Sequence, residues 1–268
     1  MGAPYASASL IAHPIGPAGA ARTTKEQVMA EESDRKQKRG RNFIVSAFLG
    51  AITIALVRHF APHLIPFDPF SFWTPRGGVG DWLWAAWPAF AYGIGVNVIA
   101  AYRDRKDPEL RAHPEAILVV GTLVSLWAGI MEEICFRWLI FLSTIFWVQV
   151  GNFLLLGFMG WGIPEHLYLW VVRHVADFTT LGGLHDVLFS AQGWFVGAAM
   201  LSANAFFRDG HKYQGLKGWI SSWFMGMFFF WIMFRFGLPA AILVHLLYDL
   251  FIFVVHWVDT RIERAMYG

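Results

Sequence analysis

The composition of this 268-residue chain is that of a protein embedded in lipid. Hydrophobic residues make up 56% of it, charged residues only 15%, and the mean hydropathy is +0.46, whereas a soluble globular domain has about 25% charged residues. The formal net charge of +2 comes without a basic stripe, which excludes a nucleic-acid-binding protein. The single cysteine, Cys135, excludes an intrachain disulfide and a cysteine-based metal site.

Residues 1–41 are expected to form a disordered cytoplasmic tail. They are rich in Ala, Gly, Pro and Ser and then in charged residues, with too little apolar content for a core. Residues 1–20 have no basic segment ahead of an apolar one and are interrupted by proline, so no cleaved signal peptide is predicted. We therefore expect the tail to persist on the mature protein.

Six apolar stretches follow, each near the ~20 residues that a helix needs to cross the hydrocarbon core. They lie at about 43–60, 82–102, 116–147, 187–207, 219–235 and 238–257. They predict an all-α bundle of transmembrane helices with six to eight spans. The third stretch is either one tilted helix or two helices meeting near Glu132. Residues 150–186 are either an outer-face hairpin or two further short spans.

These stretches also predict how the chain is organised. Residues 42–115 hold two accessory transmembrane helices and their loops. Residues 116–258 form the core of the protein, with an insertion near 150–186, and residues 259–268 form a short cytoplasmic tail.

Basic residues predict the orientation in the membrane. They cluster before the first stretch, after the second, after the fourth and after the sixth, and cytoplasmic loops carry an excess of Lys and Arg. Six crossings then place both termini in the cytoplasm. We expect a multi-pass protein of the plasma membrane of a prokaryote.

Three charged residues lie inside the third apolar stretch, where each costs roughly 2.5 to 3.5 kcal/mol at the bilayer centre. Glu133 and Arg137 are spaced i,i+4, so they share a helical face and can form a structural ion pair. That pairing leaves Glu132 without a partner. Because intramembrane ionisable residues are functional by default, the cluster indicates an active site.

Two further segments carry histidines. His245 and Asp249 are spaced i,i+4 inside the last stretch, and a histidine with a carboxylate one turn away is a recurrent orienting pair. The alternative is a hydrogen bond that packs two helices together. His211 follows the fourth stretch, four residues after Phe207, and only the combination with the other residues singles it out.

The three patterns resemble the signature of the CAAX-protease and bacteriocin-processing membrane proteins, also called the CPBP or ABI family, which includes the type II CAAX prenyl endopeptidases. That signature is Glu-Glu-x-x-x-Arg, then Phe-x-x-x-His, then His-x-x-x-Asn or Asp. In this chain the corresponding segments, in the same order, are Glu132-Glu133-Ile-Cys-Phe-Arg137, Phe207-Arg-Asp-Gly-His211 and His245-Leu-Leu-Tyr-Asp249. The resemblance covers residues 116–257.

The resemblance implies an intramembrane glutamic endopeptidase, a hydrolase that cleaves a membrane-associated protein or peptide with an activated water. Glu132 would be the general base, His211 would position or activate the water, and His245 would stabilise the oxyanion. Desolvation and the neighbouring Glu133 favour the base, because both raise the basicity of Glu132. The implied partners are the lipid bilayer and a peptide substrate.

The chain departs from the family pattern at two places. The segment between Arg137 and Phe207 is longer than is usual, which indicates an added lid, an extra hairpin or an altered function. The last motif ends in Asp249 where many members have Asn. An ionised Asp cannot donate a hydrogen bond to an oxyanion, so Asp249 either orients His245 or stays protonated.

Two alternatives remain open. We expect no cofactor, but Glu132, His211 and His245 could together hold a catalytic zinc ion. This version ranks lower because the His-Glu-x-x-His pattern is absent. A non-catalytic binding, immunity or transport protein would use the same buried ions to line a proton or substrate path.

Overall fold

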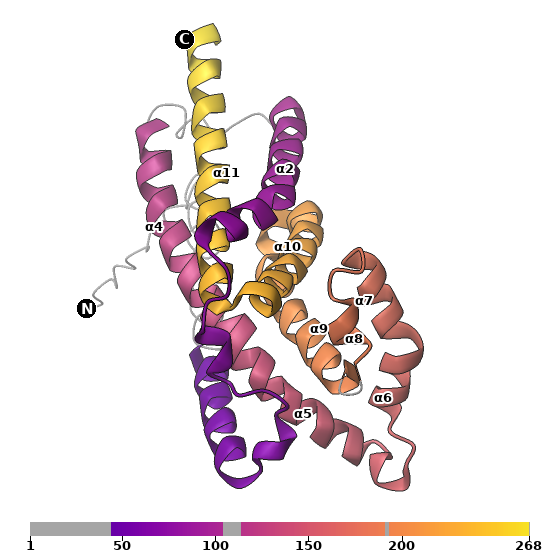
Figure 1. Cartoon of the computed structure of the whole chain (residues 1–268). Coiled ribbons are helices and arrows are strands. Elements are labelled where there is room, and N and C mark those ends of the chain that lie inside the picture. The colour runs from indigo at the N-terminus through magenta and orange to yellow at the C-terminus, as the bar shows by residue number, and fades with distance from the viewer. Residues whose placement is uncertain (1–43, 104–113, 191–192, 268) are drawn as a thin grey trace, which may run out of the picture. The chain divides into compact units, whose positions relative to one another are not determined.

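The computed structural model describes residues 44–103, 114–190 and 193–267, and every regular element in these ranges is helical (Figure 1). The all-α prediction is confirmed for this part of the chain. The predicted tail, residues 1–41, lies outside the described residues, as do most of the basic residues that predict the orientation.

Long helices make up most of the described chain. After the apolar helix Ile44–Phe60, they are α2 (Val79–Arg103), α4 (Pro114–Glu132), α5 (Phe141–Leu154), α9 (Gly193–Gly210), α10 (Gly215–Phe236) and α11 (Leu238–Tyr267). Short helices connect them: η1 (Pro62–Leu64), η2 (Ser71–Trp73), η4 (Gly157–Met159), α6 (Ile163–Leu167), α7 (Arg173–Thr179), α8 (His185–Leu188) and η6 (Lys212–Gln214). Two π-helical segments are η3 (Glu133–Ile140) and η5 (Tyr168–Val172).

Three helices in the described ranges are long and apolar enough to cross a membrane: Leu118–Leu154, Lys212–Phe236 and Leu238–Met266. The first contains 37 residues and is therefore about 55 Å long along its path, nearly twice the ~30 Å hydrocarbon core. The third predicted stretch is thus one long helix that continues through η3. The other predicted spans are helical but are not among these three.

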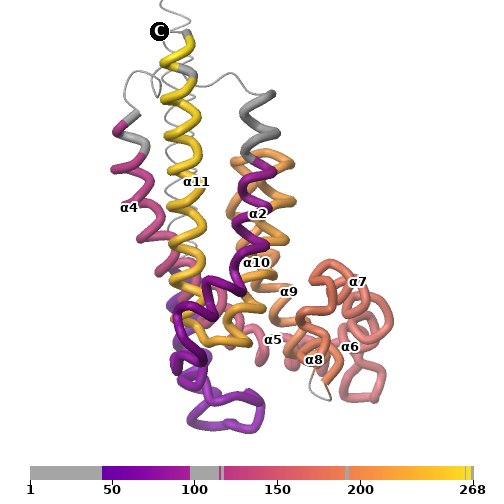
Figure 2. Tube along the Cα trace, turned by 45° about the horizontal axis from the view of Figure 1, so that its top comes forward, coloured from indigo at the N-terminus to yellow at the C-terminus, as the bar shows by residue number. Residues whose placement is uncertain are grey.

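The helix α11 packs against α4, α2 and α10 (Figures 1 and 2). Gly121 and Gly129 of α4 leave the space that Phe253 and Leu246 of α11 fill, and such small residues let membrane helices approach closely. The largest fully buried apolar side chains lie on α5, α9 and α10 and in the segment between α5 and α9.

Two contacts place several helix ends together. Arg261 Nη2 lies 2.9 Å from Glu115 Oε1, which joins the last turns of α11 to the start of α4. Lys217 Nζ donates to the carbonyl oxygen of Val96 at 3.3 Å, which joins the start of α10 to α2. Arg261 and Lys217 thus lie on helix ends that contact α4 and α2, respectively.

The segment between α5 and α9 is a series of short helices that pack on α5 and α9. Its helix 163–179, made of α6, η5 and α7, turns Tyr168 and Ala176 inward. Its apolar side chains Trp170 and Phe178 face outward, 78% and 80% exposed. Most of the segment predicted as an insertion near 150–186 is therefore folded into short helices, and none of the helices that follow Leu154 in it is among the three candidate spans.

Candidate active site

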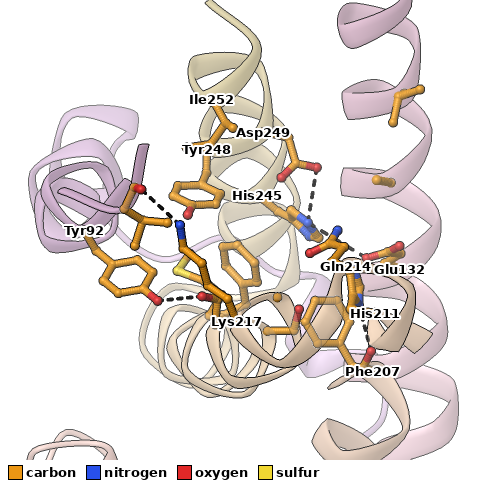
Figure 3. Close-up of a pocket in the computed structure, with 18 of the residues that line it drawn as sticks. Tyr92, Glu132, Phe207, His211, Gln214, Lys217, His245, Tyr248, Asp249 and Ile252 are labelled. Atoms are coloured by element: carbon orange, nitrogen blue, oxygen red, sulfur yellow. Dashed lines mark hydrogen bonds and ion pairs between the residues drawn. The ribbon is translucent and has the colours of Figure 1, made fainter. Parts of the chain in front are cut away.

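All six predicted site residues come together around one cavity of about 450 Å³ between α2, α4, α10 and α11 (Figure 3). Four of them line it: Glu132, His211, His245 and Asp249. The other two, Glu133 and Arg137, are fully buried and contact each other beside it. Segments that are far apart in the sequence thus form a single site.

The side chains of the two adjacent glutamates lie in different surroundings, and the helix type changes between the two residues. The α-helical path of α4 ends at Glu132, and the π-helical segment η3 begins at Glu133. The Glu132 side chain is 26% exposed on the cavity, whereas Glu133 is 0% exposed. Segments of π-helix are rare and occur frequently at functional sites.

Glu133 connects a guanidinium to an imidazole. Its Oε1 lies 3.2 Å from Arg137 Nη1 and accepts a hydrogen bond from His245 Nδ1 at 2.7 Å. The i,i+4 ion pair predicted between Glu133 and Arg137 is therefore present. Because the pair is fully buried, removing either partner would leave an uncompensated charge.

Aromatic rings enclose the Arg137 guanidinium. Its Cζ lies 4.0 Å from the centroid of the Phe207 ring, and 5.4 Å and 5.6 Å from those of Phe229 and Phe230. Cation–π contacts of this kind gain strength when the cation is desolvated. Phe207 is the first residue of the second motif, so its ring contributes to the site as well as its spacing from His211.

His245 has one nitrogen held and the other turned toward the cavity. Because Glu133 accepts the hydrogen bond from Nδ1, the Nε2 atom is the one left for chemistry. It lies 3.5 Å from Asp249 Oδ2 and 4.0 Å from Glu132 Oε2. The Phe229 ring stacks on the imidazole with centroids 4.3 Å apart. Glu133 is thus the residue that orients His245, and Asp249 is a neighbour of its reactive nitrogen.

His211 is oriented by the backbone of its own motif. Its Nδ1 donates to the carbonyl oxygen of Phe207 at 2.8 Å, which leaves Nε2 with its lone pair. The spacing in Phe207-x-x-x-His211 therefore has a structural reason, because a residue four positions earlier supplies the acceptor.

A polar cluster holds the turn that carries His211. Asp209 accepts hydrogen bonds from Lys212 Nζ at 2.8 Å, from Arg208 Nε at 2.9 Å and from Trp219 Nε1 at 2.9 Å. The bond from Lys212 is the largest cause that lowers the pKa of Asp209 to about 2. This carboxylate ties the end of α9 to the start of α10.

One carboxylate oxygen of Glu132, Oε2, is buried and has no hydrogen-bond partner among the described residues. Buried polar atoms are normally satisfied, so an unsatisfied one on a cavity marks a place for a ligand or for water. The carboxylate thus combines access to the cavity with an oxygen that the fold does not occupy.

Sequence reasoning missed several residues of the cavity. Phe229 carries no polar group and gave no signal. Lys217 was used only as a loop cation for the orientation, and Tyr92, Ser221 and Tyr248, which also line the cavity, were not singled out. An i,i+4 relation between Lys217 and Ser221, one helical turn apart on α10, was the available signal.

No protein-family model, curated protein or solved structure matches this chain. The likeness of the three motifs to the CPBP family therefore stays a prediction. In the described ranges, no three His, Cys, Asp or Glu side chains are grouped so as to hold a metal ion. The lower-ranked alternative, in which Glu132, His211 and His245 hold a zinc ion, therefore stays a prediction, which metal analysis of the pure protein can test.

Proposed function

We propose that this chain is an intramembrane endopeptidase of the CPBP type that hydrolyses a peptide bond with a water activated by Glu132. The observation that carries this proposal is the Glu132 carboxylate, whose buried and unoccupied Oε2 lies 4.0 Å from His245 Nε2 on a cavity. A general base must be accessible and close to the group that it serves. The Glu132 side chain lines the cavity and is 26% exposed, whereas the Glu133 side chain is fully buried.

The proposed reaction uses each residue at one atom. Glu132 removes a proton from water, with His211 Nε2 helping to hold that water, and the hydroxide attacks the carbonyl carbon. In this scheme His245 is an imidazolium, with Nδ1–H bound to Glu133, and its Nε2–H donates to the oxyanion that forms. The carbon–nitrogen bond then breaks, and Glu132 returns its proton to the leaving amine. Glu133 holds His245 through Nδ1, and Arg137 balances the charge of Glu133.

The proposed setting is a multi-pass protein of a prokaryotic plasma membrane with both termini in the cytoplasm. Support comes from the three apolar helices of spanning length and from Arg261 and Lys217, two basic residues on helix ends that contact α4 and α2. The substrate is a membrane-associated protein or peptide. Reporter fusions at residue 20 and at the C-terminus should report the same compartment, and opposite compartments would overturn the topology.

The decisive variant is Glu132→Gln, which keeps the size of the side chain and removes the base. Cleavage should fall at least about a hundredfold while folded yield stays near wild type. Glu115→Gln is the matched control, because Glu115 is an exposed carboxylate at the other end of α4. The measurement compares N-termini of the membrane proteome in cells that carry each variant. Identical N-termini in wild-type and Glu132→Gln cells would leave the transport or binding alternative.

Metal content separates the two peptidase mechanisms. Pure active protein should contain no stoichiometric zinc, and activity should survive treatment with a chelator. Tightly bound zinc at one ion per chain would reverse the ranking and make Glu132, His211 and His245 its ligands.

A further inference from the structure

The cavity has a second polar wall that the proposed chemistry does not use. It is formed by Lys217 and Ser221 of α10, Tyr92 of α2 and Tyr248 of α11. Figure 3 shows Lys217 and Tyr92 on the opposite side of the cavity from Glu132 and His211. A molecule that reaches the catalytic carboxylate from this side therefore passes the ammonium group.

Lys217 has no counterion in the described part of the chain. Its ammonium group donates a hydrogen bond of 3.3 Å to the neutral carbonyl oxygen of Val96. The other described lysine, Lys212, donates to Asp209 at 2.8 Å. Among the residues that line the cavity, Lys217 is the single Lys or Arg. A lone ammonium with a long, neutral partner is a donor that an incoming anion can recruit.

Hydroxyl groups extend this donor set. The hydroxyls of Tyr92 and Ser221 are hydrogen-bonded to each other at 2.8 Å, so one of the two protons is free to point elsewhere. An ammonium with neighbouring hydroxyls suits a carboxylate, whose two oxygens accept several hydrogen bonds. The opposite wall, with Glu132 and Asp249, repels the same group. The cavity is therefore polarised along its length.

We propose that Lys217, assisted by the hydroxyls of Tyr92 and Ser221, binds a carboxylate of the substrate and so selects the peptide bond that Glu132 cleaves. This inference rests on the proposed peptidase function. The carboxylate comes either from the free C-terminus of the substrate or from an Asp or Glu side chain near the cleaved bond. In both cases the anion lies at the Lys217 wall and the scissile carbonyl lies at the Glu132 wall.

The test begins with sites that disappear from the membrane proteome when Glu132→Gln replaces the wild type. Ten-residue peptides copied from such a site are made as free acids, as C-terminal amides, and with each Asp or Glu changed to Asn or Gln. The wild-type protein in detergent should cleave the form that bears the recognised carboxylate about ten- to a hundredfold better by kcat/KM. The change that removes this preference identifies the source of the carboxylate.

Variants then assign the preference to Lys217. Lys217→Gln should raise KM for the preferred peptide about ten- to a hundredfold, leave kcat within about threefold, and cleave acid and amide forms equally. Lys217→Arg should keep most of the preference because it keeps the charge. Arg235→Gln removes an exposed cation at the far end of the same helix and should behave as wild type.

Three results would overturn the inference. Unchanged N-termini with Glu132→Gln would remove the peptidase function and this inference with it. Equal cleavage of all peptide forms by the wild-type protein would remove the carboxylate site while leaving the peptidase intact. An effect of Lys217→Gln that appears only in vesicles with phosphatidylglycerol, and not with phosphatidylcholine alone, would make Lys217 a contact for lipid headgroups instead.

Discussion

The cavity and the helical segment between α5 and α9 both hold charged groups beside aromatic rings, but they arrange these charges in different ways. In the segment between α5 and α9, His185 Nδ1 lies 3.1 Å from Asp177 Oδ2, and the Arg173 guanidinium lies over the Phe189 ring at 4.7 Å. Around the cavity, Arg137 is paired while Glu132 and Asp249 face open space. Charge that is matched locally indicates packing, and charge left facing a cavity indicates chemistry.

The outer faces of the two regions differ as well. The insertion presents Trp170 and Phe178 almost fully outward, with its ions turned toward its neighbours, which is the polarity that suits a lipid environment. The cavity region turns its aromatic rings inward, onto Arg137 and His245. The same residue types thus serve as an outer surface in one region and as a wall of the site in the other.

The largest effect is expected for Arg137→Ala, which leaves the buried Glu133 carboxylate without its guanidinium partner. Stability should fall by about 3 to 5 kcal/mol because Glu133 stays buried without its counterion. Thermal unfolding in detergent measures the loss. The double variant Glu133→Gln with Arg137→Met should recover much of the folded yield, because no uncompensated ion remains.

Cleavage by the double variant separates structure from catalysis. We expect it to remain low, because the Gln side chain no longer offers His245 Nδ1 a carboxylate and the charge beside Glu132 is lost. A single Arg137→Ala variant that folds normally and cleaves at the wild-type rate would show that the pair has neither role.

Local spacing predicted part of the site, and long-range contact supplied the rest. The i,i+4 pair of Glu133 and Arg137 follows from helical geometry alone. The bond from His245 to Glu133 joins residues 112 positions apart, and nothing in a single sequence states which helices meet. The three motifs, taken in order, predicted that Glu133 and His245 belong to one site. They did not predict which carboxylate accepts the hydrogen bond from His245.

The positions of the helices were easier to predict than whether a helix spans the membrane or contains a π-helical turn. The stretches predicted as spans are mostly helical within the described ranges, because apolar length is a strong signal, although α8 ends at Leu188 and α9 begins only at Gly193. The π-helical turn at Glu133 was not predicted, since the segment that follows is mostly apolar and has no polar stripe that would reveal a change of helical period. In the insertion, Arg173 and Asp177 looked like breaks in a span, whereas in the structure they lie on the face that packs inward.

A middle-sized effect is expected where the insertion meets α9. A Cβ at Gly197 of α9 would clash with the hydroxyl of Tyr168, which is buried and donates to the carbonyl oxygen of Leu188. Gly197→Ala should therefore destabilise the protein by about 1 to 3 kcal/mol through overpacking. Gly151→Ala on α5 is the control, because a Cβ there meets nothing within 4 Å. Cleavage measured well below the unfolding temperature should stay near wild type, and a large loss of activity would show that the insertion supports the cavity.

The smallest effect concerns Asp209, which joins the ends of α9 and α10 beside His211. Its side chain is 40% exposed, so its ion pairs should contribute no more than about 1 kcal/mol at neutral pH. The sign follows from the lowered pKa of about 2: the carboxylate stabilises the fold above the ordinary Asp value of about 4 and loses this contribution as the pH falls toward 2. The unfolding free energies of the wild type and Asp209→Asn should therefore differ at pH 7 and converge between about pH 4 and pH 2. Asp186→Asn, which changes an exposed carboxylate on α8, should show no such convergence.

Since Asp209 holds the turn that carries His211, the Asp209→Asn variant should also lower kcat more than its small stability loss suggests. An unchanged kcat would mean that the Phe207 carbonyl alone is enough to orient His211.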